Sequence, residues 1–215
     1  MSAPMPKPFR FLLQFFFPAR CLFCRKHLPY DAKVPFCESC RLYLASLSPR
    51  ELPIPAGSCL YLLDYAADIR RAILAYKFHG KAQYAKPLGE LLVPLISRLG
   101  QVDVLTWAPV SALRLVGRGY DQSRLLAEAA GRLLHIPVKR MLRKRRHTRR
   151  QSRTTRQDRA ENVRGAYSLA AGYHPAGCRI VLIDDIVTTG STISECSRVL
   201  TDAGAQEVIC VALAH

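Results

Sequence analysis

Short hydrophobic runs and helical repeats alternate along most of this chain. From residue 58 onward, apolar runs typical of buried strands are separated by segments in which apolar residues recur every three or four positions. Strands that alternate with helices predict βαβ units and a mostly parallel sheet. We expect the strands at 59–63, 102–109, 138–142, 179–183 and 208–213, and the helices at 69–76, 88–99, 122–134 and 192–203.

The first quarter of the chain departs from this pattern. Residues 1–48 carry four clustered cysteines, and residues 49–57 contain three prolines, which is typical of a stiff linker. We therefore expect a small N-terminal domain over 1–48, a linker over 49–57 and an α/β domain over 58–215.

The apolar stretch over 9–17 raises the question of a membrane segment. It is interrupted by Arg10 and Gln14, and it has about half of the ~20 residues that a bilayer requires. The residues at 18–20, Pro-Ala-Arg, do not form the small-residue cleavage site of a signal peptide. We expect a short apolar helix packed on the following domain, no transmembrane segment and a cytoplasmic protein.

Four of the eight cysteines form two closely spaced pairs. Cys21 and Cys24 make the first C-x₂-C pair, and Cys37 and Cys40 make the second. This spacing is typical of a structural Zn²⁺ site, in which four thiolates surround the ion and leave no position open for water. The segment has few core residues, so zinc binding would supply much of its folding energy. The other cysteines stand singly in apolar runs, as small buried hydrophobes do in a reducing compartment: Cys59, Cys178, Cys196 and Cys210.

The clearest candidate for a ligand site follows the strand expected at 179–183. Asp184 and Asp185 stand at its carboxyl end, and a turn rich in hydroxyl groups leads into the next helix. Unpaired backbone N–H groups at a helix N-terminus bind phosphate, and Gly190 lets the backbone come close to it. Ionised carboxylates accept hydrogen bonds from a vicinal diol or bind Mg²⁺. The candidate phosphate-binding residues are Thr188, Thr189, Gly190, Ser191 and Thr192.

This segment resembles the phosphoribosyl-pyrophosphate (PRPP) loop of type I phosphoribosyltransferases. In that family the two acids hold the ribose hydroxyls and the turn cradles the 5′-phosphate. The resemblance implies an α/β fold of the type I phosphoribosyltransferase kind. It also implies that Asp184 and Asp185 bind the ribose, that the turn from Thr188 to Thr192 binds the phosphate, and that Mg²⁺ is bound together with PRPP.

Together with the cysteine pairs, further motifs resemble the ComF family, which comprises competence-associated proteins with an N-terminal zinc ribbon and a phosphoribosyltransferase-like domain. The matching segments are Lys77–Gly80, Pro109-Val110, Arg118–Gln122, Arg159–Val163 and Ile183–Thr192. The resemblance places Lys77 and Arg118 in the ligand site, although each, taken alone, is typical of a solvated charge. Asp121 is a departure, because the family usually has Asn there and a carboxylate cannot donate as an amide does.

The positive charge of the chain is concentrated in one segment. Of the formal net charge of +16, residues 139–164 carry +10, because twelve Lys and Arg face only Asp158 and Glu161. Such a charge predicts a polyanionic partner. Three interpretations stay open, namely a hood that closes over pyrophosphate, a surface that binds nucleic-acid phosphates, and a solvated charge run.

The ComF resemblance implies a cytoplasmic protein that binds PRPP and assists the uptake and handling of single-stranded DNA in natural transformation, in contact with DNA-uptake proteins. The alternative is an active phosphoribosyltransferase that transfers phosphoribose from PRPP to an unidentified acceptor. No residue is singled out as catalytic. An acceptor-binding segment would discriminate between the two, and none is evident after the strand at 208–213, which favours binding over transfer.

Overall fold

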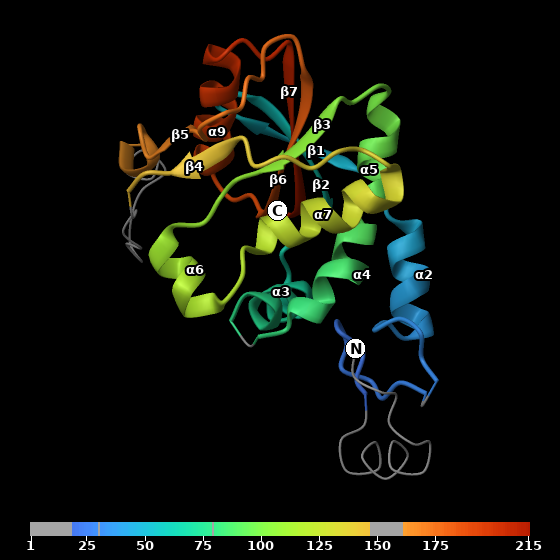
Figure 1. Cartoon of the computed structure of the whole chain (residues 1–215). Coiled ribbons are helices and arrows are strands. Elements are labelled where there is room, and N and C mark those ends of the chain that lie inside the picture. Colours follow the sequence, from blue (N-terminus) through green and yellow to red (C-terminus); the bar gives the residue numbers. More distant parts are fainter. Residues whose placement is uncertain (1–18, 30, 79, 147–160) are drawn as a thin grey trace, which may run out of the picture.

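The computed structural model describes residues 19–29, 31–78, 80–146 and 161–215 (Figure 1). The apolar helix expected over 9–17 and the middle of the basic segment, 147–160, lie outside the described residues. Within those described ranges, no helix is both long enough and apolar enough to cross a membrane.

A five-stranded sheet forms the centre of the described chain, with the strand order β1-β2-β7-β6-β3. Strands β2 (Gly57–Leu63), β7 (Glu207–Ala214), β6 (Arg179–Ile186) and β3 (Val104–Trp107) run parallel to one another. Strands of a parallel sheet are buried on both faces, which explains why these runs are almost continuously hydrophobic. The predicted α/β fold with a mostly parallel sheet is confirmed.

The linker expected over 49–57 is wrong, because most of it belongs to the sheet. Arg50–Ile54 forms strand β1, which pairs antiparallel with β2 so that Ile54 lies opposite Gly57. Proline has no N–H to donate to a ladder, and it is therefore tolerated only on edge strands such as this one. The prolines that indicated a linker instead mark an edge strand and its turn.

Helices cover both faces of the sheet (Figure 1). One face is covered by α3 (Ala67–Phe78), α4 (Ala85–Glu90), α5 (Val93–Ile96) and α7 (Gln122–Leu134). The other face is covered by α9 (Ser191–Asp202) and by a two-stranded sheet of β4 (Leu142–Lys144) and β5 (Tyr167–Leu169). Two further helices, α2 (Glu38–Ser46) and α6 (Ala112–Arg118), were not expected from the sequence.

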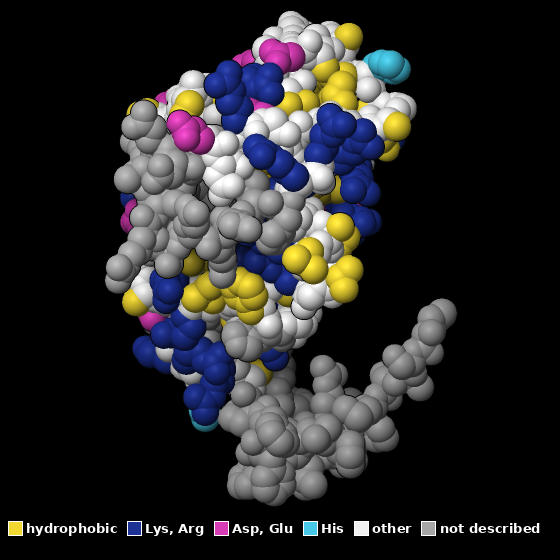
Figure 2. Space-filling view, turned by 90° about the vertical axis from the view of Figure 1, so that its left-hand side faces the viewer, with side chains coloured by type: hydrophobic (Ala, Val, Ile, Leu, Met, Phe, Trp, Pro, Cys, Tyr) yellow, Lys and Arg dark blue, Asp and Glu magenta, His cyan; other side chains and the backbone are white. Residues whose placement is uncertain are grey.

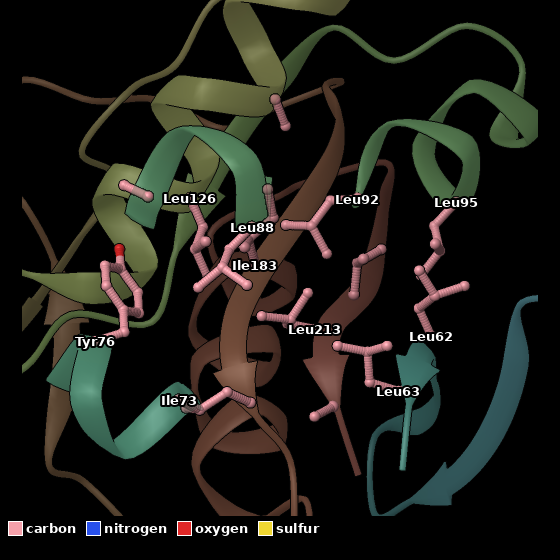
Figure 3. Packing of buried hydrophobic residues seen from close by; sticks show 14 of the residues in the cluster. Leu62, Leu63, Ile73, Tyr76, Leu88, Leu92, Leu95, Leu126, Ile183 and Leu213 are labelled. Atoms are coloured by element: carbon pink, nitrogen blue, oxygen red, sulfur yellow. The ribbon is translucent and has the colours of Figure 1, made fainter. Parts of the chain in front are cut away.

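The larger hydrophobic cluster lies between the sheet and the four helices that cover its first face, the four-helix face (Figure 3). Leu63, Leu213 and Ile183 contribute from three neighbouring strands, and Leu88 and Leu126 contribute from α4 and α7; all five are fully buried. Full burial of such a side chain stabilises the fold by roughly 1.5–3 kcal/mol. This packing fixes the carboxyl end of β6, where the acid pair lies.

Two predicted elements differ from the observed ones. The helix expected over 88–99 is divided between α4, α5 and a 3₁₀ turn, and Pro94 lies in the first turn of α5, where proline is tolerated. The strand expected over 138–142 is wrong, because Val138 forms only an isolated bridge with Leu105 and β4 begins at Leu142. Helix α7, by contrast, has the predicted bounds.

Candidate functional site

The turn between β6 and α9 forms a small concave cradle. Gly190 precedes the first residue of α9 with a φ of +74°, a left-handed conformation that glycine adopts without strain. The hydroxyl oxygens of Thr189 and Ser191 lie 2.9 Å apart across the turn. A hollow of about 60 Å³ is lined by Asp184 and by residues 186–193. All five residues predicted to bind phosphate therefore line this hollow, with Thr188 exposed at its rim.

Each carboxylate of the acid pair has a partner from another element. Asp184 Oδ1 accepts hydrogen bonds from Ser123 Oγ and from the backbone N–H of Asp185, both at 2.9 Å. Asp185 Oδ2 forms an ion pair with Lys77 Nζ at 2.8 Å, and both side chains are largely buried. The structure thus brings Lys77, from the last turn of α3, to the acids at the end of β6. Ser123, which the sequence analysis missed, directly follows the Arg118–Gln122 motif.

Burial shifts the protonation of the acid pair. Desolvation, and then repulsion from Asp185, raise the pKa of Asp184 to about 7, although Lys77 and the hydrogen bond from Ser123 oppose the rise. Two carboxylates this close are costly to ionise together in a partly buried site. A bound cation, or a diol that donates to both carboxylates, would therefore favour the doubly ionised state.

The hairpin of β1 and β2 supports the cradle from behind. A Cβ added to Gly190 would lie 2.4 Å from Cγ2 of Ile54, closer than real carbon atoms approach. The N–H of Ala56 donates to Ser194 Oγ at 3.2 Å, in the first turn of α9. Because the prolines of this hairpin indicated a linker, the packing of Ile54 on the phosphate loop was not expected from the sequence.

Arg118 lies at the end of α6, beside α3. Its guanidinium donates to Gln122 Oε1 at 2.8 Å, and its Cζ lies 4.6 Å from the centroid of the Phe78 ring. Phe78 directly follows Lys77, so Arg118 and Lys77 are brought to the same end of α3. The structure therefore gathers the predicted residues from α3, α6, β6 and α9 into one region.

Asp121 acts as an acceptor in all of its contacts. Its Oδ1 accepts from the backbone N–H of Arg124 and caps α7 at 3.3 Å. Its Oδ2 accepts from Trp107 Nε1 at 3.2 Å and from the N–H of Val110 at 3.1 Å. These three bonds lower the pKa of Asp121, but burial outweighs them and the pKa is raised. These partners need an acceptor and not a donor. A carboxylate in place of the usual Asn therefore still makes all three hydrogen bonds.

The four clustered cysteines meet at a second site. The Sγ atoms of Cys21, Cys24, Cys37 and Cys40 all lie within 4.8 Å of one another. A tetrahedral zinc ion with Zn–S bonds of about 2.3 Å separates its sulfurs by about 3.8 Å, so the cluster fits such an ion. The cluster could therefore hold a metal such as zinc, as a zinc ribbon does.

Backbone groups favour the thiolate of Cys21 and negative charge at the start of α2. Cys37 is the N-cap residue of α2 and Cys40 lies in its first turn, where the helix dipole favours negative charge. Burial raises the pKa of Cys21, but the N–H groups of Cys37, Cys24 and Phe23 outweigh it and bring the value to about 7. Burial and the neighbouring thiols raise the pKa of Cys40. Four thiols so close cannot all ionise unless a cation sits among them.

The cysteine segment packs on the α/β core. Phe23 and Phe36 lie with their ring centroids 5.0 Å apart and belong to the same hydrophobic cluster as the four-helix face. Arg71 of α3 donates to the carbonyl oxygen of Phe23 at 2.6 Å. The domain boundary at residue 48 stays a prediction, because buried residues on both sides of it share this cluster.

Both described ends of the basic segment are held in place. The N–H of Arg145 donates to the carbonyl oxygen of Ala166 at 2.8 Å, which extends the β4–β5 hairpin. The N–H of Gly165 donates to Glu195 of α9 at 2.7 Å, and Glu195 also pairs with Arg198. Burial, and then repulsion from Arg114, lower the pKa of Lys144 in β4 to about 8. The basic segment therefore begins at β3 and the β4–β5 hairpin and ends beside the helix that follows the acid pair.

Comparison with known proteins shows what the chain is similar to. The phosphoribosyl transferase domain family matches residues 121–215, which run from the capping residue of α7 to the end of the chain. Competence protein F of Haemophilus influenzae is 28% identical over 219 residues, which cover 90% of this chain and 95% of that protein. The DNA utilization protein YhgH of Escherichia coli K12 is 28% identical over 172 residues, which cover 72% of this chain and 75% of that protein.

The chain is similar to proteins of the ComF family, which these matches support. Its C-terminal part is a phosphoribosyltransferase-type domain, and its four-cysteine cluster is consistent with the zinc ribbon of that fold. Among solved structures, adenine phosphoribosyltransferase of Leishmania tarentolae is 15% identical to this chain and aligns with a TM-score of 0.42 over 76% of this chain and 79% of that one.

Proposed function

We propose that the chain binds PRPP in the cradle between β6 and α9. The observation that carries the proposal is that two acids, with Lys77 beside them, adjoin a turn whose backbone opens toward a helix N-terminus. Asp184 and Asp185 accept hydrogen bonds from the ribose hydroxyls, and the turn from Thr188 to Thr192 binds the 5′-phosphate. Lys77 and Arg118 supply positive charge to the pyrophosphate.

Mg²⁺ fits this proposal because it prefers oxygen ligands and keeps several waters while bridging carboxylates and phosphates. The acids at the end of β6 are the described residues that would hold it together with PRPP. When bound, Mg²⁺ would neutralise charge on the acids and on the pyrophosphate. Lys77 meanwhile orients Asp185, and Ser123 orients Asp184.

Calorimetry with PRPP and Mg²⁺ tests this site. Wild type should bind, and the double variant Asp184→Ala with Asp185→Ala should lose binding. The matched control is Asp202→Asn, which removes one exposed acid from the far end of α9 and should bind as wild type does. Equal binding by wild type and the double variant would refute the assignment.

We further propose that the protein handles single-stranded DNA in natural transformation. Support comes from the charge of residues 139–164 and from relatives whose names concern competence and DNA utilization. On the face shown in Figure 2, Lys and Arg side chains outnumber those of Asp and Glu. This role places the protein in the cytoplasm and in contact with DNA-uptake proteins.

The zinc ion, held by all four cysteines, is structural.

Salt dependence tests the DNA surface. Contacts to single-stranded phosphates give a log–log slope of about −0.7 per phosphate contacted. Two variants that each lose four positive charges separate the candidate surfaces: Arg145, Arg146, Arg149 and Arg150 to Ala in the basic segment, and Arg20, Arg25, Lys26 and Arg41 to Ala beside the cysteines. The first should weaken binding and flatten the slope, and the second should not. The opposite result would move the DNA surface to the cysteine segment.

Transfer of phosphoribose to an acceptor is the second candidate function. The match to the phosphoribosyl transferase domain family favours it. Catalysis of this kind stabilises a cationic transition state and a pyrophosphate leaving group through fixed charges and a metal ion. Release of pyrophosphate from PRPP by wild type, and not by the Asp184→Ala/Asp185→Ala variant, would support transfer. Tight PRPP binding without release would support the binding role alone.

A further inference from the structure

An exposed aromatic residue directly follows Lys77, the ion-pair partner of Asp185. Phe78 is 46% exposed, although it follows Lys77, whose ammonium is buried against Asp185. The guanidinium of Arg118 lies over the ring, 4.6 Å from its centroid. A single exposed apolar side chain is common on protein surfaces, but this ring is held against a guanidinium next to a residue of the acid site, where a ligand can reach it.

The Phe78 ring and the Arg118 guanidinium form a stack. Hydrogen bonds on both sides hold this stack in place. The hydroxyl of Tyr76 donates to the carbonyl oxygen of Gln122 at 2.8 Å, and the hydroxyl of Tyr120 donates to the carbonyl oxygen of Tyr76. Gln122 is 1% exposed and accepts from Arg118 at 2.8 Å. The end of α3 is thereby fixed to the start of α7, and the ring and the guanidinium are presented rather than left to move freely.

Two pairs of consecutive residues join the stack to the acid pair. At the end of α3, Lys77 contacts Asp185 while Phe78 contacts Arg118. At the start of α7, Ser123 contacts Asp184 while its neighbour Gln122 contacts Arg118. In each pair, one residue contacts an acid and its neighbour contacts Arg118. The stack therefore adjoins the proposed phosphoribose site.

Positive charge continues from the stack toward the basic segment. Arg114 and Arg118 lie one turn apart on α6, which places them on the same side of that helix. Arg114 is close enough to Lys144 to help lower the pKa of that ammonium group, after burial. Lys144 lies in β4, and the basic segment continues directly from this strand. A nucleic acid whose phosphates contact Lys144, Arg114 and Arg118 would bring one of its bases next to the Phe78 ring.

We propose that Phe78, backed by Arg118, is a stacking platform for a nucleobase of single-stranded nucleic acid. The inference rests on the proposed DNA function and adds a place where a base is bound. Bases stack on aromatic rings with little sequence preference, and an arginine against the ring strengthens such platforms. The residues 139–164 contain no Phe, Tyr or Trp, so stacking on a ring of these types comes from outside the segment that supplies most of the charge.

Two probes of equal length and charge test the platform: an oligothymidylate and an abasic deoxyribose-phosphate oligomer. Each stacked base contributes about 5- to 150-fold in affinity, so wild type should prefer the thymine probe by at least about 5-fold. Phe78→Leu should abolish this preference while leaving the salt slope unchanged. Phe78→Trp should retain it, and thymine binding should quench the fluorescence of the new tryptophan, because Trp107 is buried.

Tyr43→Leu is the matched control, because Tyr43 is an aromatic residue of α2 with 44% exposure that lies on the cysteine segment. It should keep the preference for thymine. Loss of the preference in this variant rather than in Phe78→Leu would overturn the proposal. Equal affinity of wild type for both probes would overturn the platform and leave the DNA function intact, whereas binding of neither probe would overturn both.

Discussion

The cysteine cluster and the acid pair both concentrate like charge in a small volume, but different parts of the chain hold them. The acids end a strand that lies between two neighbours and is packed on both faces. The cysteines lie on a turn and at the start of α2, a helix without a buried residue of its own. The sheet therefore shapes the acid site without a ligand, whereas the cysteine site would depend more on a bound ion.

Because of this difference, a bound cation would have a different effect at each of the two sites. At the cysteines, a metal ion would cross-link two short segments and supply folding energy directly. At the acids, a cation would relieve repulsion within a scaffold that is already formed. Loss of ligand should therefore unfold one region and leave the other in place.

Removal of the metal is the largest expected effect. Structural zinc supplies about 10–16 kcal/mol of apparent binding free energy in small zinc peptides, so Cys37→Ser should unfold the segment around the cluster. Elemental analysis should give one zinc per wild-type chain and well under one for the variant, and limited proteolysis should cleave the variant first between residues 19 and 48. Wild type that lacks zinc yet resists protease there would contradict the comparison.

Cys178→Ser is the matched control, because it removes a partly exposed cysteine far from the cluster in sequence. Its zinc content and proteolysis should equal those of wild type. PRPP binding should persist in Cys37→Ser if the acid site is independent of the ion.

The acid site should instead be sensitive to its packing. Gly190→Ala places a methyl group 2.4 Å from Ile54 in a left-handed backbone conformation. The conformation costs about 1–2 kcal/mol, and overpacking costs a further 1–3 kcal/mol, roughly. Denaturant titration should show this loss, together with weaker PRPP binding.

Gly172→Ala isolates the packing contribution. Gly172 also has a positive φ, of +80°, but nothing lies within 4 Å of an added Cβ. Gly172→Ala should therefore lose only the stability that the left-handed conformation costs. The difference in the free energy of unfolding between the two variants then measures the contact with Ile54. If the two variants lose equal stability, β1 does not support the loop.

The sequence predicted best the parts of the molecule in which pattern and packing agree. The parallel strands appear as continuous apolar runs, and α7 begins where Asp121 caps it. The acids and the cysteine pairs were found because their chemistry needs particular residues at fixed spacing. The resemblance to a family then added Lys77 and Arg118, which are unremarkable as single charges.

What the sequence could not show are contacts between distant segments. Ile54 packs on Gly190 and Ser123 bonds to Asp184, across 136 and 61 positions of the chain. The three prolines fit either a linker or an edge strand, and only pairing with β2 decides between them. Val138 lies in an apolar run but ends in a single bridge, because strand length depends on neighbours that the sequence does not display.

The smallest effect, and the one that sharpens the comparison most, is the pH dependence of the acid site. An aspartate has an unfolded pKa of about 3.9, and burial beside Asp185 raises that of Asp184 to about 7 in the folded state. The folded protein therefore binds more protons between these values, and this contribution makes stability fall as pH rises from about 4 to about 7. Asp184→Asn keeps an oxygen that accepts from Ser123, removes the charge, and should stabilise the protein at pH 8 by on the order of 2 kcal/mol.

Urea titrations from pH 5 to pH 8 measure this difference, which should shrink toward pH 5. Both chains carry the same cysteines, so thiol titration cancels between them. The control Asp64→Asn removes an exposed acid paired with Arg50, and a surface pair of this kind contributes only about 0–1 kcal/mol. If Asp184→Asn destabilises the protein at pH 8, the acids are not strained before ligand binds. A bound cation would then have no repulsion to relieve at the acid site, contrary to the role given to it above.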